Sequence, residues 1–405
     1  MSSPSVVVIG AGHAAIQLAA SLRQGRYDGA ITLINDEGGL PYQRPPLSKA
    51  FLGGHLDETA LALRPANFYA AQAITVVEND SVTAIDRAER MVQLASGTML
   101  PFSHLVLATG AANRPLPAPG ATLPGVVGLR NLREAKALKA LLPDLRRGVV
   151  VGAGFIGLEF AAVAAARGIA VTVIEAAPRP LMRGVSEFMS GHLAATHRGW
   201  GSTLLTDTGV RAIHGTDRAE AVETTDGQMI PADLVLVAIG VVPNTSLATA
   251  AGLKVGNGIV VDAVLATDDP AISALGDCAA FPMAGQPGLI RLESVQNASD
   301  QARCLADRLL GKPAPYAKLP WFWSDQGAHT LLIAGLSGGH DHIALRGDPA
   351  SGAFSVFCFR GDDLIAVESL NRAPDHMAAR RFLAGTQAIT PEQAADPAFN
   401  LRTAG

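Results

Sequence analysis

The sequence predicts an α/β protein with two doubly wound, mainly parallel sheets and a smaller α+β unit at its C-terminal end. Three observations support this fold class. A strand–glycine turn–helix–strand pattern occurs twice, with its first glycines at Gly10 and Gly152. The strands of both copies are continuous apolar runs, as expected for strands buried on both faces of a parallel sheet. After Pro320, short alternating runs indicate an antiparallel sheet.

The elements of the first copy follow from its apolar pattern. Residues 5–9 are a β-branched run that predicts a strand, 15–22 are an Ala-rich helical stretch, and 30–34 predict the second strand. Further strands are predicted at 74–77, 82–85 and 104–110. Residues 111–124 contain four prolines and few periodic apolar positions, which is typical of a crossing between domains.

The second copy repeats this order, and a different pattern follows it. A strand at 233–240 ends in glycine and precedes Pro243-Asn244, which we interpret as a second crossing. The second copy predicts a strand at 148–151, a helix at 158–166 and a strand at 170–174. A short strand is then expected at 272–277, a helix at 294–310, strands at 330–333, 343–345, 354–359 and 364–367, and a closing helix at 373–383.

Composition excludes several classes of protein. The chain has 405 residues and a formal net charge of −4, whereas a nucleic-acid-binding protein would show a basic field. The spacing of Cys278, Cys304 and Cys358 fits neither a zinc site nor a disulfide framework, so we predict no metal and expect a reducing compartment. We recognise no export signal, and the most apolar run, 149–166, contains three glycines and Glu159. We therefore expect a cytoplasmic protein that does not enter a membrane.

Both glycine turns match the fingerprint of dinucleotide-binding sites. The first glycine permits the tight turn, the second lets the backbone approach the pyrophosphate, and the third small residue lets helix and strand pack closely. Each helix N-terminus offers unpaired N–H groups and a positive dipole end to the phosphates. The residues are Gly10, Gly12 and Ala15 in the first copy and Gly152, Gly154 and Gly157 in the second.

Two such turns predict two Rossmann-type dinucleotide-binding domains. FAD with NAD(P)H is the economical pair of cofactors, since flavin accepts a hydride and releases electrons singly. An acidic residue after the second strand should bind a ribose. Glu175 takes this position in the second domain and favours NADH over NADPH, although nearby Arg179 would weaken that preference. In the first domain the candidates are Asp36 and Glu37.

Longer segments of the chain are similar to one family. They are residues 41–49 (PYQRPPLSK), 108–110 (ATG), 152–159 (GAGFIGLE), 276–277 (GD) and 321–325 (WFWSD), in this order after the first glycine turn. The chain resembles the FAD-dependent, NADH-using ferredoxin reductases of bacterial oxygenase systems over essentially its whole length. The resemblance implies a glutathione-reductase-like fold with a C-terminal α+β domain. It implies an FAD-binding domain at 1–112 and 242–319, an NAD-binding domain at 113–241 and a C-terminal domain at 320–405.

The resemblance also implies the site residues. Arg44 and Lys49 would lie along the flavin, Asp277 would hold the ribityl chain, and Trp323 would border the ring where electrons leave. Glu293 and Val295 would meet the far edge of the isoalloxazine at a helix N-terminus, which stabilises negative charge. The remaining FAD-binding candidates are Val82, Ala108, Gly110 and Arg130, and the remaining NAD-binding candidates are Ile156, Arg183 and Gly240.

Lys49 and Glu159 are the predicted catalytic residues. Glu159 stands inside an apolar helix, where a charge needs a partner, and a buried ion pair with Lys49 would orient both groups and tune the flavin. The alternative is that Lys49 is a surface lysine after a proline turn.

Disulfide reductases of the same fold carry Cys-x4-Cys on the helix after the first ribose loop, but residues 45–51 here contain no cysteine. We therefore exclude a dithiol relay and interpret Cys278 as a small packed side chain.

The predicted reaction passes electrons from NADH through FAD to a small acidic [2Fe–2S] ferredoxin that feeds an oxygenase such as a haem monooxygenase. We expect a monomer or weak dimer, and we interpret Trp321 as a core residue of the last domain.

Two alternative functions remain open. An NADH-dependent reductase of a quinone, oxygen or an organic radical would share both sites. A flavin-bound interaction protein similar to apoptosis-inducing factor would need a basic surface and a targeting segment, and we see neither. Charge and position suggest docking residues at Arg64, Arg303, Arg308 and Lys312.

Overall fold

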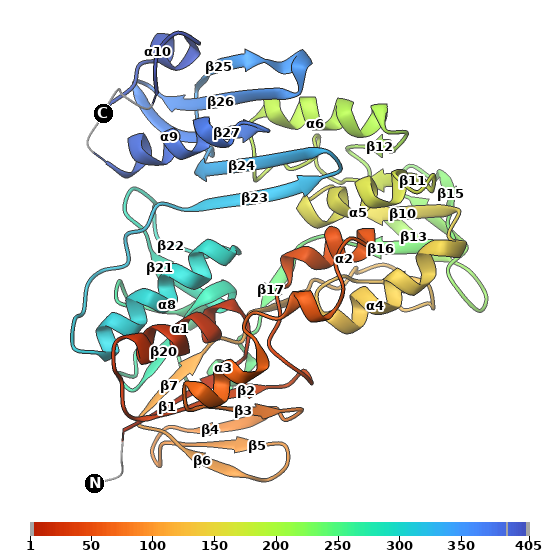
Figure 1. Ribbon diagram of the computed structural model, residues 1–405. Helices are drawn as coiled ribbons and strands as arrows, with labels where there is room; N and C mark the ends of the chain where they lie inside the picture. The colour runs from red at the N-terminus through yellow and green to blue at the C-terminus, as the bar shows by residue number, and fades with distance from the viewer. Residues whose placement is uncertain (1–3, 386–387, 402–405) are drawn as a thin grey trace. The chain divides into compact units, whose positions relative to one another are not determined.

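The computed structural model describes residues 4–385 and 388–401 of the chain (Figure 1). The outermost residues of the first and last predicted domains, 1–3 and 402–405, lie outside the described part. The chain forms two compact units. The first contains residues up to 43, 58–112 and 242–318, and the second contains residues 44–57, 113–241 and those from 319 onward.

The first unit is built on a five-stranded parallel sheet in the order β20-β7-β1-β2-β3. Ile9 at the end of β1 lies opposite Ile34 on β2 and Leu107 on β7, so three strands end at the same edge. Helices α1 and α8 pack on each other (Figure 1). The bounds are β1 (Ser5–Ile9), α1 (His13–Gln24), β2 (Ala30–Asn35), β3 (Ile74–Glu78), β7 (His104–Leu107), β20 (Ile272–Ala274) and α8 (Val295–Leu309).

Smaller elements complete this unit. The three strands from Val82 to Pro101 form an antiparallel sheet. Four short strands form a mixed sheet, in which the central pair β19 and β21 is parallel. The bounds are η2 (Thr59–Leu61), α3 (Ala66–Ala71), β4 (Val82–Asp86), β5 (Met91–Leu94), β6 (Met99–Pro101), α7 (Ser246–Ala250), β18 (Val255–Gly256), β19 (Gly258–Val260), η4 (Gly276–Cys278), β21 (Ala279–Pro282) and β22 (Leu289–Ile290). Two of the passages between the units lie at β8 (Ala111–Asn113) and β17 (Val241–Pro243), and the others fall at residues 43/44, 57/58 and 318/319.

The second unit contains another parallel sheet, in the order β12-β11-β10-β16-β9. Val151 on β10 lies opposite Ile174 on β11 and Val237 on β16, which repeats the register of the first sheet. The bounds are η1 (Pro45–Ser48), α2 (Ala50–Gly53), β9 (Val126–Val127), α4 (Leu132–Leu141), η3 (Leu142–Asp144), β10 (Arg147–Val151), α5 (Phe155–Ala165), β11 (Ala170–Ile174), α6 (Glu187–Gly199), β12 (Thr203–Leu205), β13 (Val210–His214), β14 (Ala221–Thr224), β15 (Met229–Pro231) and β16 (Leu234–Val237).

The C-terminal part of this unit is an antiparallel sheet in the order β23-β24-β27-β26-β25. Alternate residues of its strands, such as Phe357 and Val367, pack against Ala379 and Phe382 of α9. The bounds are β23 (Trp321–Gln326), β24 (His329–Gly335), β25 (His342–Asp348), η5 (Pro349–Ser351), β26 (Ala353–Arg360), β27 (Asp363–Leu370), α9 (Ala373–Ala384) and α10 (Pro391–Ala395). The predicted fold class, with two Rossmann-type sheets and an α+β part, is confirmed.

Three predicted strands end earlier than expected, two or three residues before a glycine with a positive φ. The strands predicted to reach residues 110, 240 and 277 stop at Leu107, Val237 and Ala274. Gly110, Gly240 and Gly276 have φ angles of +65°, +95° and +78°, a conformation that cannot continue a strand. Asp277 therefore lies in a 3₁₀ turn rather than at a strand end.

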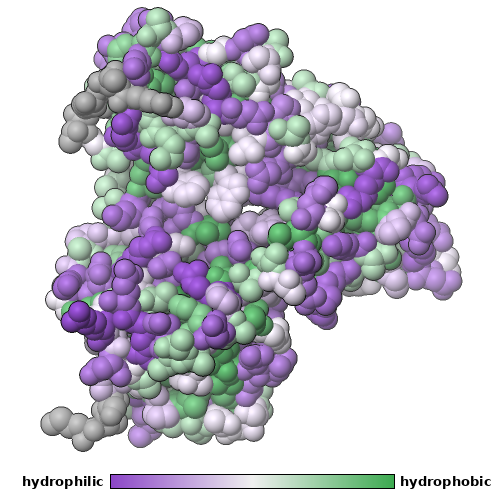
Figure 2. All heavy atoms as spheres, in the orientation of Figure 1, coloured by the Kyte–Doolittle hydropathy of each residue, from purple (hydrophilic) through white to green (hydrophobic). Residues whose placement is uncertain are grey.

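The surface carries few large apolar side chains. Figure 2 shows hydrophilic residues over much of one face, with apolar residues in small groups between them. Single exposed apolar residues are normal on folded proteins and do not by themselves mark an interaction surface. The exposed ones are Leu40, Met99, Leu141, Met182, Met229, Val242, Leu289 and Met377. Across residues 4–385 and 388–401, no helix has the length and apolar character needed to cross a bilayer.

Candidate functional site

The first glycine turn forms an open cradle at the edge of its sheet. Gly10 has a φ of +110°, and a Cβ there would lie 2.3 Å from the Ala108 carbonyl oxygen. A Cβ at Gly12 would meet no atom within 4 Å, so the space beside the turn is open. Gly12 caps α1 and supplies no side-chain acceptor, and a helix N-terminus of this kind favours an anion. These features fit the pyrophosphate of a dinucleotide.

A cavity of about 170 Å³ opens beside this turn, within the first unit. It brings together Gly10, Asp36 and Val82, which the sequence assigned separately to FAD. Of the two acidic candidates, Asp36 lines the cavity, whereas the Glu37 carboxylate accepts a hydrogen bond from the hydroxyl of Tyr42. The other lining residues are Ile9, Ile34, Asp80, Ser81, Thr109, Asn244, Ser246 and Leu247.

Thr109 and Asn244 form a reciprocal contact that the sequence did not reveal. The Thr109 hydroxyl donates to the Asn244 carbonyl oxygen at 2.7 Å, and the Asn244 amide donates to the Thr109 carbonyl oxygen at 2.8 Å. These residues flank the two crossing strands, so the contact fixes both crossings next to the cavity. Thr109 stands inside the 108–110 motif, and this position was the sequence feature that could have identified it as a site residue.

Two other predicted FAD residues are joined by an arginine. Arg291, only 8% exposed, donates to the Asp277 carbonyl oxygen at 3.0 Å and pairs with the Glu293 carboxylate at 2.6 Å. Val295 begins α8, and Ser294 caps it by accepting from the Asn297 N–H at 3.0 Å. The predicted helix N-terminus is therefore present next to Glu293.

The second glycine turn has the same geometry as the first. Gly152 has a φ of +103°, and a Cβ there would lie 2.5 Å from the Ala238 carbonyl oxygen. At Gly157, a Cβ would lie 2.1 Å from the Gly152 carbonyl oxygen, so the helix approaches the turn too closely for a side chain. The Glu175 carboxylate accepts from Ala153 N at 2.7 Å and from Ala177 N at 2.9 Å. Glu175 thus lies directly beside the turn that would hold a pyrophosphate.

The remaining NAD-binding candidates lie around this turn. Ile156 is in the first turn of α5, directly after the glycine turn. The Arg183 guanidinium lies 4.0 Å from the position that a Cβ would take at Gly240. Gly154 caps α5 without a side-chain acceptor, so its helix also presents unpaired N–H groups.

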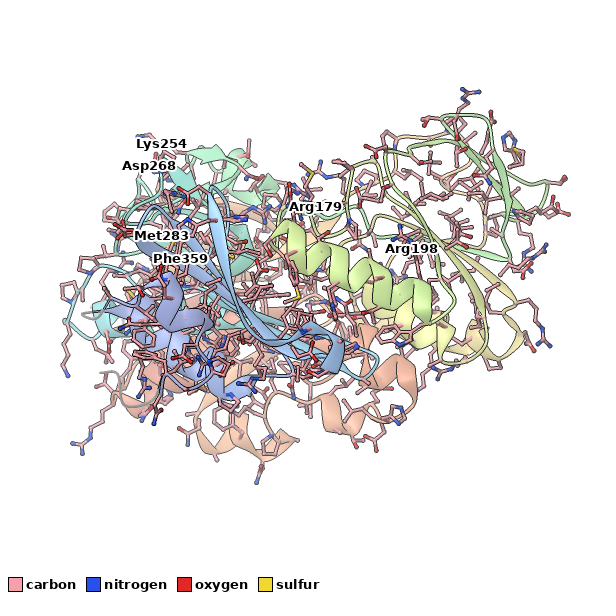
Figure 3. All side chains as sticks on the ribbon, turned by 90° about the horizontal axis from the view of Figure 1, so that it is seen from above. Arg179, Arg198, Lys254, Asp268, Met283 and Phe359 are labelled. Atoms are coloured by element: carbon pink, nitrogen blue, oxygen red, sulfur yellow. The ribbon has the colours of Figure 1, made fainter. Side chains whose placement is uncertain are left out.

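Arg179, which was expected to weaken discrimination at Glu175, is held by backbone carbonyl groups, and its effect on that discrimination stays a prediction. Its guanidinium donates to the carbonyl oxygens of Val185 at 3.0 Å and Met182 at 3.1 Å. Figure 3 shows Arg179 at the start of α6, with Arg198 at the opposite end of that helix. These hydrogen bonds fix the guanidinium and leave its positive charge in place.

Lys49 and Glu159 form the predicted ion pair. Lys49 Nζ lies 3.3 Å from Glu159 Oε1, and the side chains are 11% and 4% exposed. Ser48 and Ser324 donate to the same carboxylate at 2.5 and 2.6 Å. Burial raises the pKa of Glu159, while Lys49 and the two hydroxyls oppose that rise by stabilising the anion. The reading of Lys49 as a surface lysine is therefore wrong.

Other predicted flavin-side residues lie in the second unit with Lys49. Its ammonium lies 5.4 Å from the centroid of the Trp323 ring and 3.5 Å from the partly exposed Asp325 carboxylate. Arg44 donates to the Arg130 carbonyl oxygen at 3.1 Å. Four segments distant in sequence therefore meet here, in one compact unit.

No thiol pair accompanies these groups. Cys278 and Cys358 are fully buried, and burial raises the pKa of both thiols. Cys304 is partly buried, and all three cysteines are free. Cys278 packs as predicted, with its sulfur 3.4 Å from the Leu107 carbonyl oxygen. Among the described residues, no group of three or more His, Cys, Asp or Glu side chains is arranged to hold a metal ion.

One docking prediction and one core prediction need correction. Arg308 is not a free docking residue: it is partly buried, donates to the Ser273 hydroxyl and lies 3.3 Å from His104 Nε2. Trp321 is not a core residue, because it is only partly buried and the Arg380 guanidinium lies 4.9 Å from its ring centroid. The remaining docking candidates stay predictions: Arg303 and Lys312 are exposed, and Arg64 packs over Phe68.

The two glycine turns, the cavity at Asp36 and the buried lysine–glutamate pair define a flavin- and pyridine-nucleotide-dependent oxidoreductase without a thiol relay. The chain belongs to the pyridine nucleotide-disulphide oxidoreductase family, whose model matches residues 4–302. A reductase C-terminal family model matches residues 321–405. FAD and NAD(H) are the cofactors of this family and of this chain.

Known proteins resemble the chain over its whole length. Rhodocoxin reductase of Rhodococcus erythropolis is 51% identical over 401 residues, which cover 99% of this chain and 94% of the relative. The ferredoxin reductase of the CYP199A2 system from Rhodopseudomonas palustris has a TM-score of 0.97 at 49% identity and covers 99% of both chains. The reductase in the covalent putidaredoxin reductase–putidaredoxin complex has a TM-score of 0.94 at 38% identity, with 98% of this chain and 97% of that one covered.

Proposed function

We propose that this protein transfers electrons from NADH, through bound FAD, to a small acidic [2Fe–2S] ferredoxin that feeds an oxygenase such as a haem monooxygenase. The full-length similarity to reductases of redox carriers is the observation that supports it most strongly. The buried ion pair and the unpaired cysteines agree with it, because electrons then leave without a thiol relay. When bound, FAD would supply the chemistry that converts a hydride into two single electrons.

The first glycine turn would hold the FAD pyrophosphate. Its helix offers N–H groups to the phosphates, and Asp36 would accept hydrogen bonds from a ribose. Lys49 and Glu159 would present a fixed cation to the flavin, with Arg44 and Trp323 beside them. The other residues proposed for FAD are Ala15, Val82, Ala108, Gly110, Arg130, Asp277, Glu293 and Val295.

The second glycine turn would hold NADH rather than NADPH. The Glu175 carboxylate would repel a 2′-phosphate, and the Arg179 guanidinium is held on backbone carbonyl oxygens. Arg183 and Gly240 would flank the nucleotide, because the guanidinium approaches that glycine.

We also propose the three-domain division with boundaries at 112/113, 241/242 and 319/320. The protein would act in the cytoplasm, where NADH is supplied, as a monomer or weak dimer. Exposed Arg303 and Lys312 carry charge suited to an acidic carrier.

A comparison of electron acceptors tests the proposal. Holoprotein is mixed with NADH in a stopped-flow instrument, and [2Fe–2S] ferredoxin, a quinone or oxygen is then added. We expect the flavin to be reduced by NADH and reoxidised by ferredoxin at least tenfold faster than by the other acceptors. Faster turnover with quinone or oxygen would contradict the proposal and identify a small-acceptor reductase. Slow reduction with a long-lived charge-transfer band would instead indicate an interaction protein.

A further inference from the structure

A buried carboxylate of the C-terminal sheet contacts the start of helix α6. Glu368 on β27 is fully buried, and its two oxygens accept hydrogen bonds from the backbone N–H and the hydroxyl of Ser186, both at 2.6 Å. Ser186 is 1% exposed, and its hydroxyl oxygen accepts from Met189 N at 3.3 Å, which caps α6. Burial raises the pKa of Glu368, while the two Ser186 donors oppose that rise by stabilising the anion, helped by Ser337 and His340. The reaction proposed above does not use Glu368.

The segment that ends at Ser186 begins at the NAD-binding candidate Glu175. Helix α6 holds this segment by further contacts. The Ser190 hydroxyl donates to the Pro180 carbonyl oxygen at 2.5 Å, and Arg179 donates to the Ser186 carbonyl oxygen at 3.5 Å. The position of α6 therefore determines the position of residues 176–185.

The same segment also contacts the glycine turn. Leu181 N donates to the Ala153 carbonyl oxygen at 3.0 Å. Leu181 has a φ of +53°, which is uncommon for a residue other than glycine, and it is 5% exposed. Such a conformation persists only where the surroundings enforce it. Arg183, two residues further, is the group that approaches Gly240.

We propose that Glu368 is a positioning residue for the pyridine nucleotide. Glu368 holds Ser186 in place, and Ser186 in turn holds residues 176–185 against the turn at Gly152. Glu175 and Arg183 are therefore ordered before the nucleotide binds. An ordered segment loses less conformational freedom on binding, which increases affinity. This inference rests on the assignment of the NAD site to Gly152 and Glu175.

The test compares Glu368→Gln with Glu187→Gln in the FAD-loaded protein. The amide introduced by E368Q would face two donors with only one oxygen, whereas Glu187 is an exposed carboxylate in the first turn of the same helix. The dissociation constant of NAD⁺ is measured by titration, together with FAD content and melting temperature. We expect E368Q to weaken NAD⁺ binding roughly tenfold with wild-type FAD content, and E187Q to change it less than about twofold. In turnover with ferricyanide, E368Q should raise the KM for NADH roughly tenfold and leave kcat within about twofold.

Further variants keep the test decisive. Ser186→Ala removes one of the two donors and should weaken NAD⁺ binding roughly threefold to tenfold, even if E368Q does not fold. The double variant should bind NAD⁺ about as E368Q does, because both changes act through one contact. Wild-type NAD⁺ affinity in S186A, or in E368Q with a lower melting temperature only, would overturn the inference. Glu175→Ala separates the two proposals: if it does not weaken NAD⁺ binding, the assigned NAD site itself is wrong.

Discussion

Lys49 Nζ lies 3.3 Å from Glu159 Oε1 in a pocket where both side chains are almost excluded from solvent. The lysine follows the 3₁₀ turn of the 41–49 motif, and the glutamate is on the helix after the second glycine turn. The pair therefore joins the segment assigned to the flavin to the domain assigned to the nicotinamide. A buried charge whose partner is removed is costly, so the pair is open to a direct test.

Replacement of Lys49 by Met should lower the free energy of unfolding by about 3 kcal/mol at pH 8. The loss should be smaller at pH 5.5. Without Lys49, the pKa of Glu159 lies further above its unfolded value, and the native state then binds more protons than the unfolded state. The stability of the variant consequently falls as the pH rises from 5.5 to 8. Urea denaturation at the two pH values checks this.

The double variant K49M/E159Q is the control for this prediction. It leaves no uncompensated charge, so it should recover at least half of the lost stability at pH 8 and show no added pH dependence. Equal losses in the single and double variants would show that packing, rather than charge, is responsible.

The two glycine turns predict separable losses of the two cofactors. Gly10→Ala should lower the FAD content of purified protein at least fivefold, because the new Cβ would lie 2.3 Å from a carbonyl oxygen. Gly152→Ala should keep FAD but weaken NAD⁺ binding roughly tenfold or more, since its Cβ would meet Ala238. Flavin absorbance and NAD⁺ titration measure these effects.

Gly168→Ala is a matched control: the φ of Gly168 is +73°, but a Cβ there would meet nothing within 4 Å. Loss of FAD in G152A would argue against the assignment.

Glu175→Ala should reduce kcat/KM for NADH roughly tenfold to a hundredfold, because charge-assisted hydrogen bonds to the ribose are lost. The value for NADPH should change less, or rise, because a repulsive carboxylate is removed. Steady-state kinetics with both nucleotides and ferricyanide give the ratio. Exposed Glu220 of the same domain supplies the control, and Glu220→Gln should leave the preference unchanged. An unaltered preference in E175A would show that another group selects NADH.

His104 predicts an acid-sensitive contribution to stability. Burial and the neighbouring Arg308 lower its pKa to about 4. The unfolded state therefore binds this proton at a higher pH than the native state does. As a result, stability is lost as the pH falls from about 6.5 to about 4. The loss for this group is about 3 kcal/mol. His104→Gln should flatten the stability profile over that range by about this amount, and His55→Gln, at an exposed position, should not. Identical profiles for wild type and H104Q would refute the assignment.

Sequence patterns predicted those features that depend on backbone geometry or on an isolated charge. The glycine turns were visible because only glycine tolerates the φ angles at Gly10 and Gly152. The ion pair was visible because Glu159 interrupts an apolar helix. Ser48 and Ser324 were not, since a hydroxyl finds partners in almost any environment.

Two other residues were missed or misread for similar reasons. Glu368 stands in an alternating strand, where a charge normally faces solvent, but here it is buried against the start of α6 and Cys358. Arg308 appeared free because its partners, His104 and Ser273, come from distant strands. Long-range contacts of this kind leave no periodic signal in the chain.

The central claim is that electrons are stored on the flavin alone and leave without help from sulfur. An anaerobic titration of the FAD-loaded protein with NADH tests it most directly, because a redox-active thiol pair would accept two further electrons per chain. We expect complete bleaching of the flavin at one equivalent of NADH, and full recovery of the oxidised spectrum on addition of two equivalents of a one-electron [2Fe–2S] ferredoxin. Consumption of a second equivalent of NADH, or a reduced flavin that ferredoxin does not reoxidise, would contradict the account.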